Sequence, residues 1–136
     1  MDKYITFFVG ILDNQANEFV YVNAGHNPPI LQHQDGSVSM LEEGGIILGM
    51  LPDYTYKTGK IKIQQSDILI CYTDGVNEAL NKKNEEYGEE RLMVFIKANQ
   101  NLNSRDLAEK IVDSISQFTA EAPQYDDITL LVVKRI

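Results

Sequence analysis

The sequence lacks the features that mark secreted, membrane-spanning and nucleic-acid-binding proteins. Its single cysteine, Cys71, has no partner for an internal disulfide and stands in an apolar stretch, which predicts a small core residue in a reducing, cytoplasmic compartment. No apolar run approaches the roughly 18 residues that a membrane span needs. Lysine and arginine together number 12 against 20 aspartates and glutamates, and the resulting net charge of -8 argues against nucleic acid as a partner.

The chain also lacks a phosphate-binding loop. The glycine-bounded segment 44–50 contains neither the lysine nor the serine or threonine of such a loop, so no nucleotide site is expected there. What is present is a composition typical of one globular domain, with 136 residues, 43% of them hydrophobic and 24% charged. We therefore expect residues 1–136 to form a single domain. The acidic balance suits cation binding or simple solubility, and charge alone favours solubility.

Residues 68–79 (ILICYTDGVNEA) form the stretch around which the chain is organised. Residues 68–72 are apolar or strand-forming on both faces, which predicts a central strand that is covered on both sides. Asp74 then stands at the exit of this strand, and we expect Gly75 to permit a sharp turn after it. A short helical pattern follows over residues 76–80.

A second carboxylate pair, Asp126-Asp127, precedes the strand-like residues 128–133. If the two strands are antiparallel neighbours, the exit of one lies beside the entrance of the other, and Asp74 and Asp126 meet at one edge of the sheet. Magnesium and manganese prefer carboxylate and water oxygens, so this edge is a candidate site for divalent cations. The alternative is that both dipeptides form turns, and their spacing alone favours turns over a metal site.

The rest of the pattern predicts roughly seven strands and two substantial helices. The further strand-like segments are residues 4–12, 19–23, 30–34, 38–41 and 61–63. The first of them is apolar on both faces, so it needs a partner on each side. One helical pattern surrounds residues 92–96, and the clearer one has Ser104 as its cap and an apolar stripe of Leu107, Ile111, Ile115 and Phe118. Consecutive hairpins followed by late helices predict an α+β fold, an antiparallel β-sandwich flanked by helices.

Five motifs resemble, in this order, those of one family, the SpoIIE-type bacterial phosphatases. This family of stage II sporulation protein E and regulator-of-sigma-B type belongs to the metal-dependent serine/threonine protein phosphatases. The resemblance extends from about residue 6 to residue 133, and although each motif is weak alone, five in register are a strong indication. The motifs are YVNAGHNPP at residues 21–29, Leu48-Gly49, YTDGVNEA at residues 72–79, YGEERL at residues 87–92 and DDIT at residues 126–129.

The resemblance implies a β-sandwich flanked by helices, with a dinuclear manganese or magnesium centre at one end. It implies hydrolysis of phosphoserine or phosphothreonine on a small regulatory protein, typically an anti-sigma-factor antagonist. Asp74 matches the aspartate of the family's Thr-Asp-Gly motif, and Asp126 matches the first aspartate of its Asp-Asp-Ile-Thr motif. Both are metal ligands in the family and act through a water that the ions activate.

Four further residues are expected to support these ligands: Asp127, Gly75, His26 and Asn27. Asp127 would orient its loop or hold a water. His26 has two interpretations, since it can protonate the leaving serine oxygen or form a turn in which its imidazole bonds a backbone carbonyl, and we favour the turn. For Glu78, a local capping role is favoured over a place at the rim of the site.

One element of the family pattern does not occur in this sequence. The phosphatases carry an earlier Asp-x-x-Gly-His-Gly-like motif that supplies a further aspartate to the metals, and nothing similar is found here. We therefore expect the C-terminal two-thirds of a phosphatase domain with its N-terminal part missing, half a metal site, and no activity of this chain alone. Uncovered sheet edges would then favour a homodimer. The rival hypothesis is a non-catalytic interaction module that keeps the fold in order to bind a signalling partner.

Overall fold

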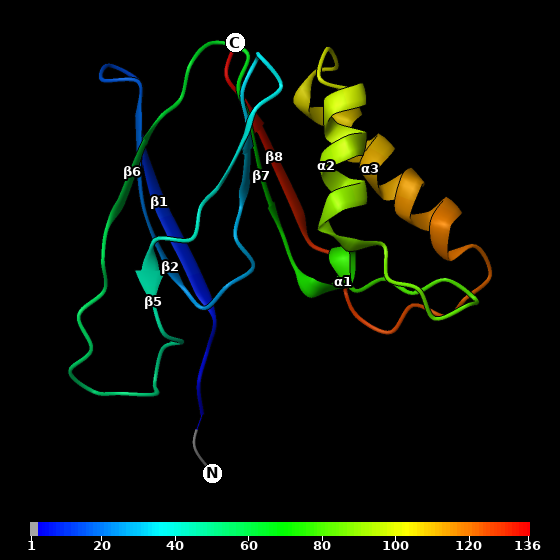
Figure 1. Cartoon of the computed structure of the whole chain (residues 1–136), viewed down its shortest axis with the longest axis horizontal. Helices are drawn as coiled ribbons and strands as arrows, with labels where there is room; N and C mark the ends of the chain where they lie inside the picture. The colour runs from blue at the N-terminus through cyan, green and yellow to red at the C-terminus, as the bar shows by residue number, and fades with distance from the viewer. Residues whose placement is uncertain (1–2) are drawn as a thin grey trace.

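Two four-stranded sheets packed face to face form the centre of the molecule (Figure 1). The computed structural model describes residues 3–136. The first sheet contains β1 (Phe7–Asp13), β2 (Glu18–Ala24), β5 (Gly44–Gly45) and β6 (Gly59–Lys62). The second has the order β4 (Val38–Met40), β3 (Ile30–Gln32), β7 (Ile68–Tyr72) and β8 (Leu130–Lys134). Neighbouring strands are antiparallel, apart from the two-residue parallel pairing of β5 with β2.

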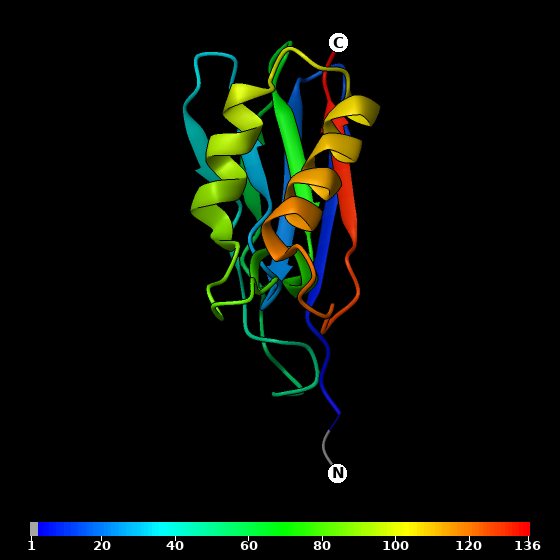
Figure 2. The same ribbon diagram turned by 90° about the vertical axis from the view of Figure 1, so that its right-hand side faces the viewer.

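Helices cover the outer face of the second sheet. The helices α2 (Gly88–Ala98) and α3 (Ser104–Thr119) lie side by side in front of its strands in Figure 2, and the short α1 (Asp74–Asn77) follows β7 directly. The predicted α+β sandwich, with helices on one sheet, is confirmed. Within residues 3–136 there are eight strands rather than seven, since the apolar segment 44–50 contributes the short β5. No helix in this part of the chain is long and apolar enough to cross a membrane.

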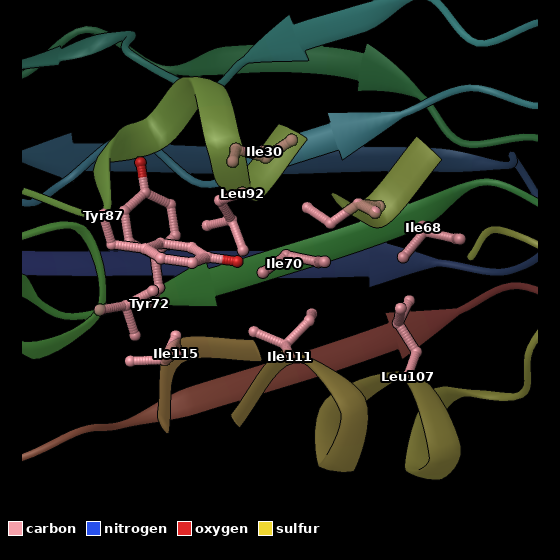
Figure 3. Close-up of a cluster of buried hydrophobic side chains, with 11 residues drawn as sticks. Ile30, Ile68, Ile70, Tyr72, Tyr87, Leu92, Leu107, Ile111 and Ile115 are labelled. Atoms are coloured by element: carbon pink, nitrogen blue, oxygen red, sulfur yellow. The ribbon is translucent and has the colours of Figure 1, made fainter. Parts of the chain in front are cut away.

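Strand β7 is central, as its two apolar faces predict. It lies between β3 and β8, and its residues alternate between two cores. Ile68, Ile70 and Tyr72 face the helices and belong to the larger core (Figure 3). Leu69 and Cys71 contact the smaller core between the two sheets. Burial of large apolar side chains on both faces stabilises β7 by roughly 1.5–3 kcal/mol each, which makes the strand a rigid base for the residues that follow it.

Strand β1 departs from the expectation of a partner on each side. Among the described residues it pairs as a strand only with β2. Its apolar side chains are largely exposed, including Phe7, Val9 and Ile11, the last to 71%. The strand therefore presents an open edge and apolar surface, which is the uncovered edge that the sequence predicts.

Two helix ends differ from the sequence predictions. Asn103 rather than Ser104 caps α3, because the Asn103 side chain accepts a hydrogen bond from the Asp106 N–H at 2.8 Å, and Ser104 is already helical. Helix α1 occupies Asp74–Asn77 instead of residues 76–80. The aspartate expected at the strand exit is thus itself the first residue of the helix.

Candidate functional site

The antiparallel pairing of β7 with β8 places the two aspartate motifs at the same edge of the second sheet. The ladder continues past the strand ends, with a hydrogen bond from the Thr73 N–H to the Thr129 carbonyl at 3.2 Å. Asp74 follows this point on one side, and Asp126 and Asp127 precede it on the other. The register therefore brings the motifs together, as the assumption of antiparallel neighbours predicts.

The side chain of Thr73 fastens the two strand ends to each other. Its Oγ1 accepts a hydrogen bond from the Thr129 N–H at 3.1 Å and donates one to the Asp127 carbonyl at 3.4 Å. A hydroxyl can do both, because it has a donor and two acceptor lone pairs. The backbone that carries Asp127 is thereby tied to the residue that precedes Asp74.

Gly75 permits a close approach of two chain segments rather than the sharp turn that the sequence predicts. It lies inside α1, and its φ is not among the positive values found for other glycines. A Cβ atom at this position would stand 2.1 Å from the carbonyl oxygen of Asp127. Because only glycine lets α1 come this near, Gly75 sets the separation of the two aspartate motifs.

A hollow of about 290 Å³ opens between the aspartate motifs and the loop after β2. Asp74, Asp126 and Asp127 are exposed there, and none of them forms an ion pair within residues 3–136. Carboxylates without a cationic partner are the donor groups that hard divalent cations use. The hollow is lined by Thr6, Gly25, His26, Asn27, Thr73, Asp74, Asp126, Asp127 and Thr129.

The loop after β2 brings Asn27 and His26 to this hollow from the opposite side. The Asn27 amide donates to Oδ1 of Asp74 at 2.6 Å and to Oδ1 of Asn77 at 3.2 Å. Nδ1 of His26 lies 3.0 Å from the Asn27 carbonyl, and since a carbonyl only accepts, this nitrogen carries the proton. The contact is the one that the turn interpretation of His26 expects.

Asp126 and Glu78 are held by hydrogen bonds to residues close to them in the sequence. The Asp126 carbonyl accepts from Nε2 of Gln124 at 2.8 Å, while its carboxylate accepts from the Asp127 N–H at 2.8 Å. The Glu78 N–H donates to the Asp74 carbonyl at 2.9 Å, and its side chain is exposed. This contact closes α1 and agrees with the local capping role. The Glu78 side chain also borders a crevice of about 110 Å³ that Asp74 and Asp126 share.

The carboxylates fit a divalent cation but do not complete its coordination. Within the part of the chain that the structure describes, no three histidine, cysteine, aspartate or glutamate side chains are arranged to hold a metal ion. A magnesium ion takes about six oxygen ligands in near-octahedral geometry. Asp74 and Asp126 would supply two of them and leave the others to water or to groups elsewhere.

Tyr72 and Cys71, at the end of β7, are kept protonated by their surroundings. Burial, a 2.8 Å hydrogen bond to Glu89 and the charges of Glu89 and Asp74 raise the pKa of Tyr72 well above its usual value. Burial likewise raises the pKa of the Cys71 thiol to about 11. A protonated thiol is a poor nucleophile, so Cys71 acts as the core residue that the sequence predicts.

Sequence reasoning missed two polar residues of the site, Thr73 and Thr129, and a third residue that lies beside it, Asn77. Each stands within three positions of a predicted aspartate, but each makes its contact with another segment. The two threonines belong to the Thr-Asp-Gly and Asp-Asp-Ile-Thr motifs, and this membership was the available signal. Asn77 likewise belongs to the YTDGVNEA motif, but the motif does not indicate that its partner is Asn27, 50 residues away.

Comparison with known proteins decides the family. Residues 1–136 match the family described as stage II sporulation protein E (SpoIIE) along their whole length. The chain belongs to the SpoIIE family. The family resemblance of the five motifs is thus confirmed.

Two relatives match this SpoIIE-family chain over nearly all of its residues. Protein IcfG of Synechocystis sp. is 32% identical over 135 residues, which are 99% of this chain and 21% of that protein. Phosphoserine phosphatase RsbU of Bacillus subtilis is 28% identical over 133 residues, which are 97% of this chain and 39% of RsbU. The chain is therefore homologous to a phosphoserine phosphatase, and it spans less than half the length of either relative.

Solved structures share the fold at low sequence identity. The SiaA-PP2C domain of Pseudomonas aeruginosa matches with a TM-score of 0.83 at 20% identity, over 98% of this chain and 53% of that one. The manganese-presoaked SpoIIE phosphatase domain of Bacillus subtilis matches with a TM-score of 0.73 at 18% identity, over 96% of this chain and 56% of that one. RsbX in complex with magnesium matches with a TM-score of 0.67 at 21% identity, over 95% of this chain and 55% of that one. The SpoIIE-family chain thus has a PP2C-type phosphatase fold and covers about half of these chains.

Proposed function

We propose that the chain forms the C-terminal part of a metal-dependent phosphatase domain, of which it spans about half in the solved structures. Its substrate is phosphoserine or phosphothreonine on a regulatory protein of the anti-sigma-factor antagonist type. The observation that carries the proposal is the meeting of Asp74, Asp126 and Asp127 in one hollow, where β7 ends and β8 begins. Homology to phosphoserine phosphatase RsbU supports the reaction type.

Asp74 and Asp126 are the proposed ligands of Mn²⁺ or Mg²⁺, and Asp127 orients its own loop or holds a water beside the ions. Two structures with the same fold are described as manganese-presoaked and as a magnesium complex, which supports this choice of metals. When bound, such ions activate a water and offset the negative charge of the phosphoryl group. The protein positions the ligands, since the two strands hold the carboxylates and Thr73 links the strand ends. The open hollow admits a phosphorylated side chain.

The donor set predicts that this chain alone is inactive. A dinuclear centre needs more carboxylates than Asp74 and Asp126, and no third metal-ligating side chain joins them within residues 3–136. The remaining ligands would come from the part of a phosphatase domain that this chain does not match. The same observation favours a second candidate function, a non-catalytic interaction module that binds a signalling partner through the phosphatase fold.

Manganese-dependent hydrolysis of p-nitrophenyl phosphate tests the proposal. The chain would be assayed alone and as part of a phosphatase domain of full length, each with Asp74→Asn beside it. Asp113→Asn, an exposed aspartate on α3 that does not line the hollow, is the matched control. We expect no hydrolysis by the chain alone and turnover by the full-length domain. In the full-length domain, Asp74→Asn should lower the hydrolysis rate by more than about 100-fold, because a metal ligand contributes at least as much as the residues that orient it.

The other outcomes separate the two candidate functions. Turnover by the chain alone that depends on Asp74 would show that the site is already complete. A full-length domain that is inactive but still binds its phosphoprotein partner would establish the interaction module instead.

A further inference from the structure

The side-chain amide of Asn27 has both of its donors engaged by α1. One N–H reaches Oδ1 of Asp74 at 2.6 Å, and the other reaches Oδ1 of Asn77 at 3.2 Å. The opposite orientation of the amide would turn the Asn27 carbonyl oxygen toward a carboxylate that only accepts. The Asp74 carboxylate therefore fixes the orientation of the Asn27 amide.

Asn27 stands on a loop that is itself held firmly. The buried Asn23 accepts a hydrogen bond from the His26 N–H at 2.8 Å, and its amide donates to the carbonyls of His26 at 3.0 Å and Leu41 at 3.1 Å. Pro28 and the proline after it restrict the backbone on the other side of Asn27. The amide thus approaches Asp74 from a rigid support that is 47 residues away in sequence.

The contact restricts the carboxylate of Asp74, which is otherwise exposed at the start of α1. Among the described residues, Asn27 provides the only hydrogen bond to this carboxylate, and the bond is made to Oδ1. A hydrogen bond to an ionised acceptor is stronger than one between neutral groups. Because Oδ1 accepts this bond, the carboxylate has a preferred orientation, while Oδ2 accepts no hydrogen bond from the described residues.

We propose that Asn27 is a positioning residue that orients the Asp74 carboxylate for cation binding. This inference rests on the proposed function and adds a residue to it. Groups that orient a metal ligand contribute roughly 10- to 100-fold to metal affinity. The rival explanation is that Asn27 merely ties the loop to α1, and Asn77 offers the control, since its contact also joins loop and helix but leaves Asp74 untouched.

The experiment compares Asn27→Ala with Asn77→Ala by two measurements. Mn²⁺ affinity is obtained from the electron paramagnetic resonance signal of free Mn²⁺, titrated into the chain up to millimolar concentrations. The free energy of unfolding is obtained from urea denaturation without metal. We expect Asn27→Ala to lower the Mn²⁺ affinity by roughly 10- to 100-fold, Asn77→Ala to leave it nearly unchanged, and both variants to lower stability alike.

Failure of this inference differs from failure of the proposed function. If Mn²⁺ binds and the two variants change its affinity equally, or Asn27→Ala does not change it, Asn27 is only a tie between loop and helix. If the unmodified chain binds no Mn²⁺, and a full-length domain binds none either, the metal site and the positioning role are both wrong. Loss of binding in Asp74→Asn confirms that the measured site is this one.

Discussion

The two ends of β7 carry an aspartate each, and the structure uses them in opposite ways. Asp67 at the entrance is 2% exposed and accepts three hydrogen bonds from the protein. The donors are Nδ1 of His33 at 3.0 Å and the backbone N–H groups of Gln34 at 3.2 Å and Gln64 at 2.9 Å. Asp74 at the exit is exposed and accepts one side-chain bond, from Asn27 at 2.6 Å.

The difference shows what makes a carboxylate structural or available to a ligand. At Asp67 the protein supplies three hydrogen-bond donors that replace water, so the burial of the carboxylate is tolerated. Its oxygens are therefore not available to a ligand. At Asp74 most of the acceptor capacity remains free, and a second exposed carboxylate, Asp126, lines the same hollow. A metal ion needs such free oxygens, which the entrance end of the strand cannot offer.

The largest expected effect comes from Asp67→Asn, compared with Asp74→Asn. The NH₂ group of the new asparagine would face N–H groups that the carboxylate of Asp67 had accepted from, and at least one of them would lose its acceptor. We therefore expect a loss of about 3 kcal/mol in the free energy of unfolding. Asp74→Asn should change it by less than about 0.5 kcal/mol, as is usual for exposed positions. Urea denaturation of both variants measures this, and equal losses would remove the distinction between the two ends.

A smaller effect is expected from Gly75→Ala at the exit end. The added Cβ would meet the Asp127 carbonyl oxygen at 2.1 Å, so α1 or the segment before β8 must move. We expect a loss of about 1–3 kcal/mol in stability, typical of overpacking, together with weaker Mn²⁺ binding. Asn77→Ala in the same helix is the control, because it removes atoms without a clash. Unchanged Mn²⁺ affinity in Gly75→Ala would show that this close approach does not set the site.

The smallest effect concerns Cys71, three residues before the first residue of α1 at the exit end. Its pKa is raised from 9.0 to about 11 in the folded protein, so the folded state keeps its proton at pH values where the unfolded state loses it. The resulting stability is fully present below pH 9 and is lost as the pH rises toward 11. The difference in unfolding free energy between the unmodified chain and Cys71→Ala should therefore be constant below this window and shrink within it. If this difference in unfolding free energy stayed constant between pH 9 and 11, burial would not raise the pKa of the Cys71 thiol.

Local patterns predicted the elements around β7 well. The run of residues 68–72, apolar on both faces, identified a central strand, and short sequence signals identified the two aspartate motifs that flank the β7–β8 pair. The reason for Gly75 was wrong, because a glycine needed for close approach looks the same in sequence as one needed for a turn. The sequence pattern predicts Ser104 as the cap of α3, but Asn103 beside it is an equally suitable residue type and forms the cap.

The sequence by itself determined the family, the α+β sandwich and the choice of Asp74 and Asp126 as candidate ligands, since motifs and hydrophobic periodicity are local properties of the chain. Only the tertiary structure decided which aspartate is buried and which is open. The donors of Asp67 include His33, 34 residues away, and the donor of Asp74 is Asn27, 47 residues away. Which donors reach a carboxylate depends on how distant segments pack, and that packing sets the acceptor capacity left for a ligand.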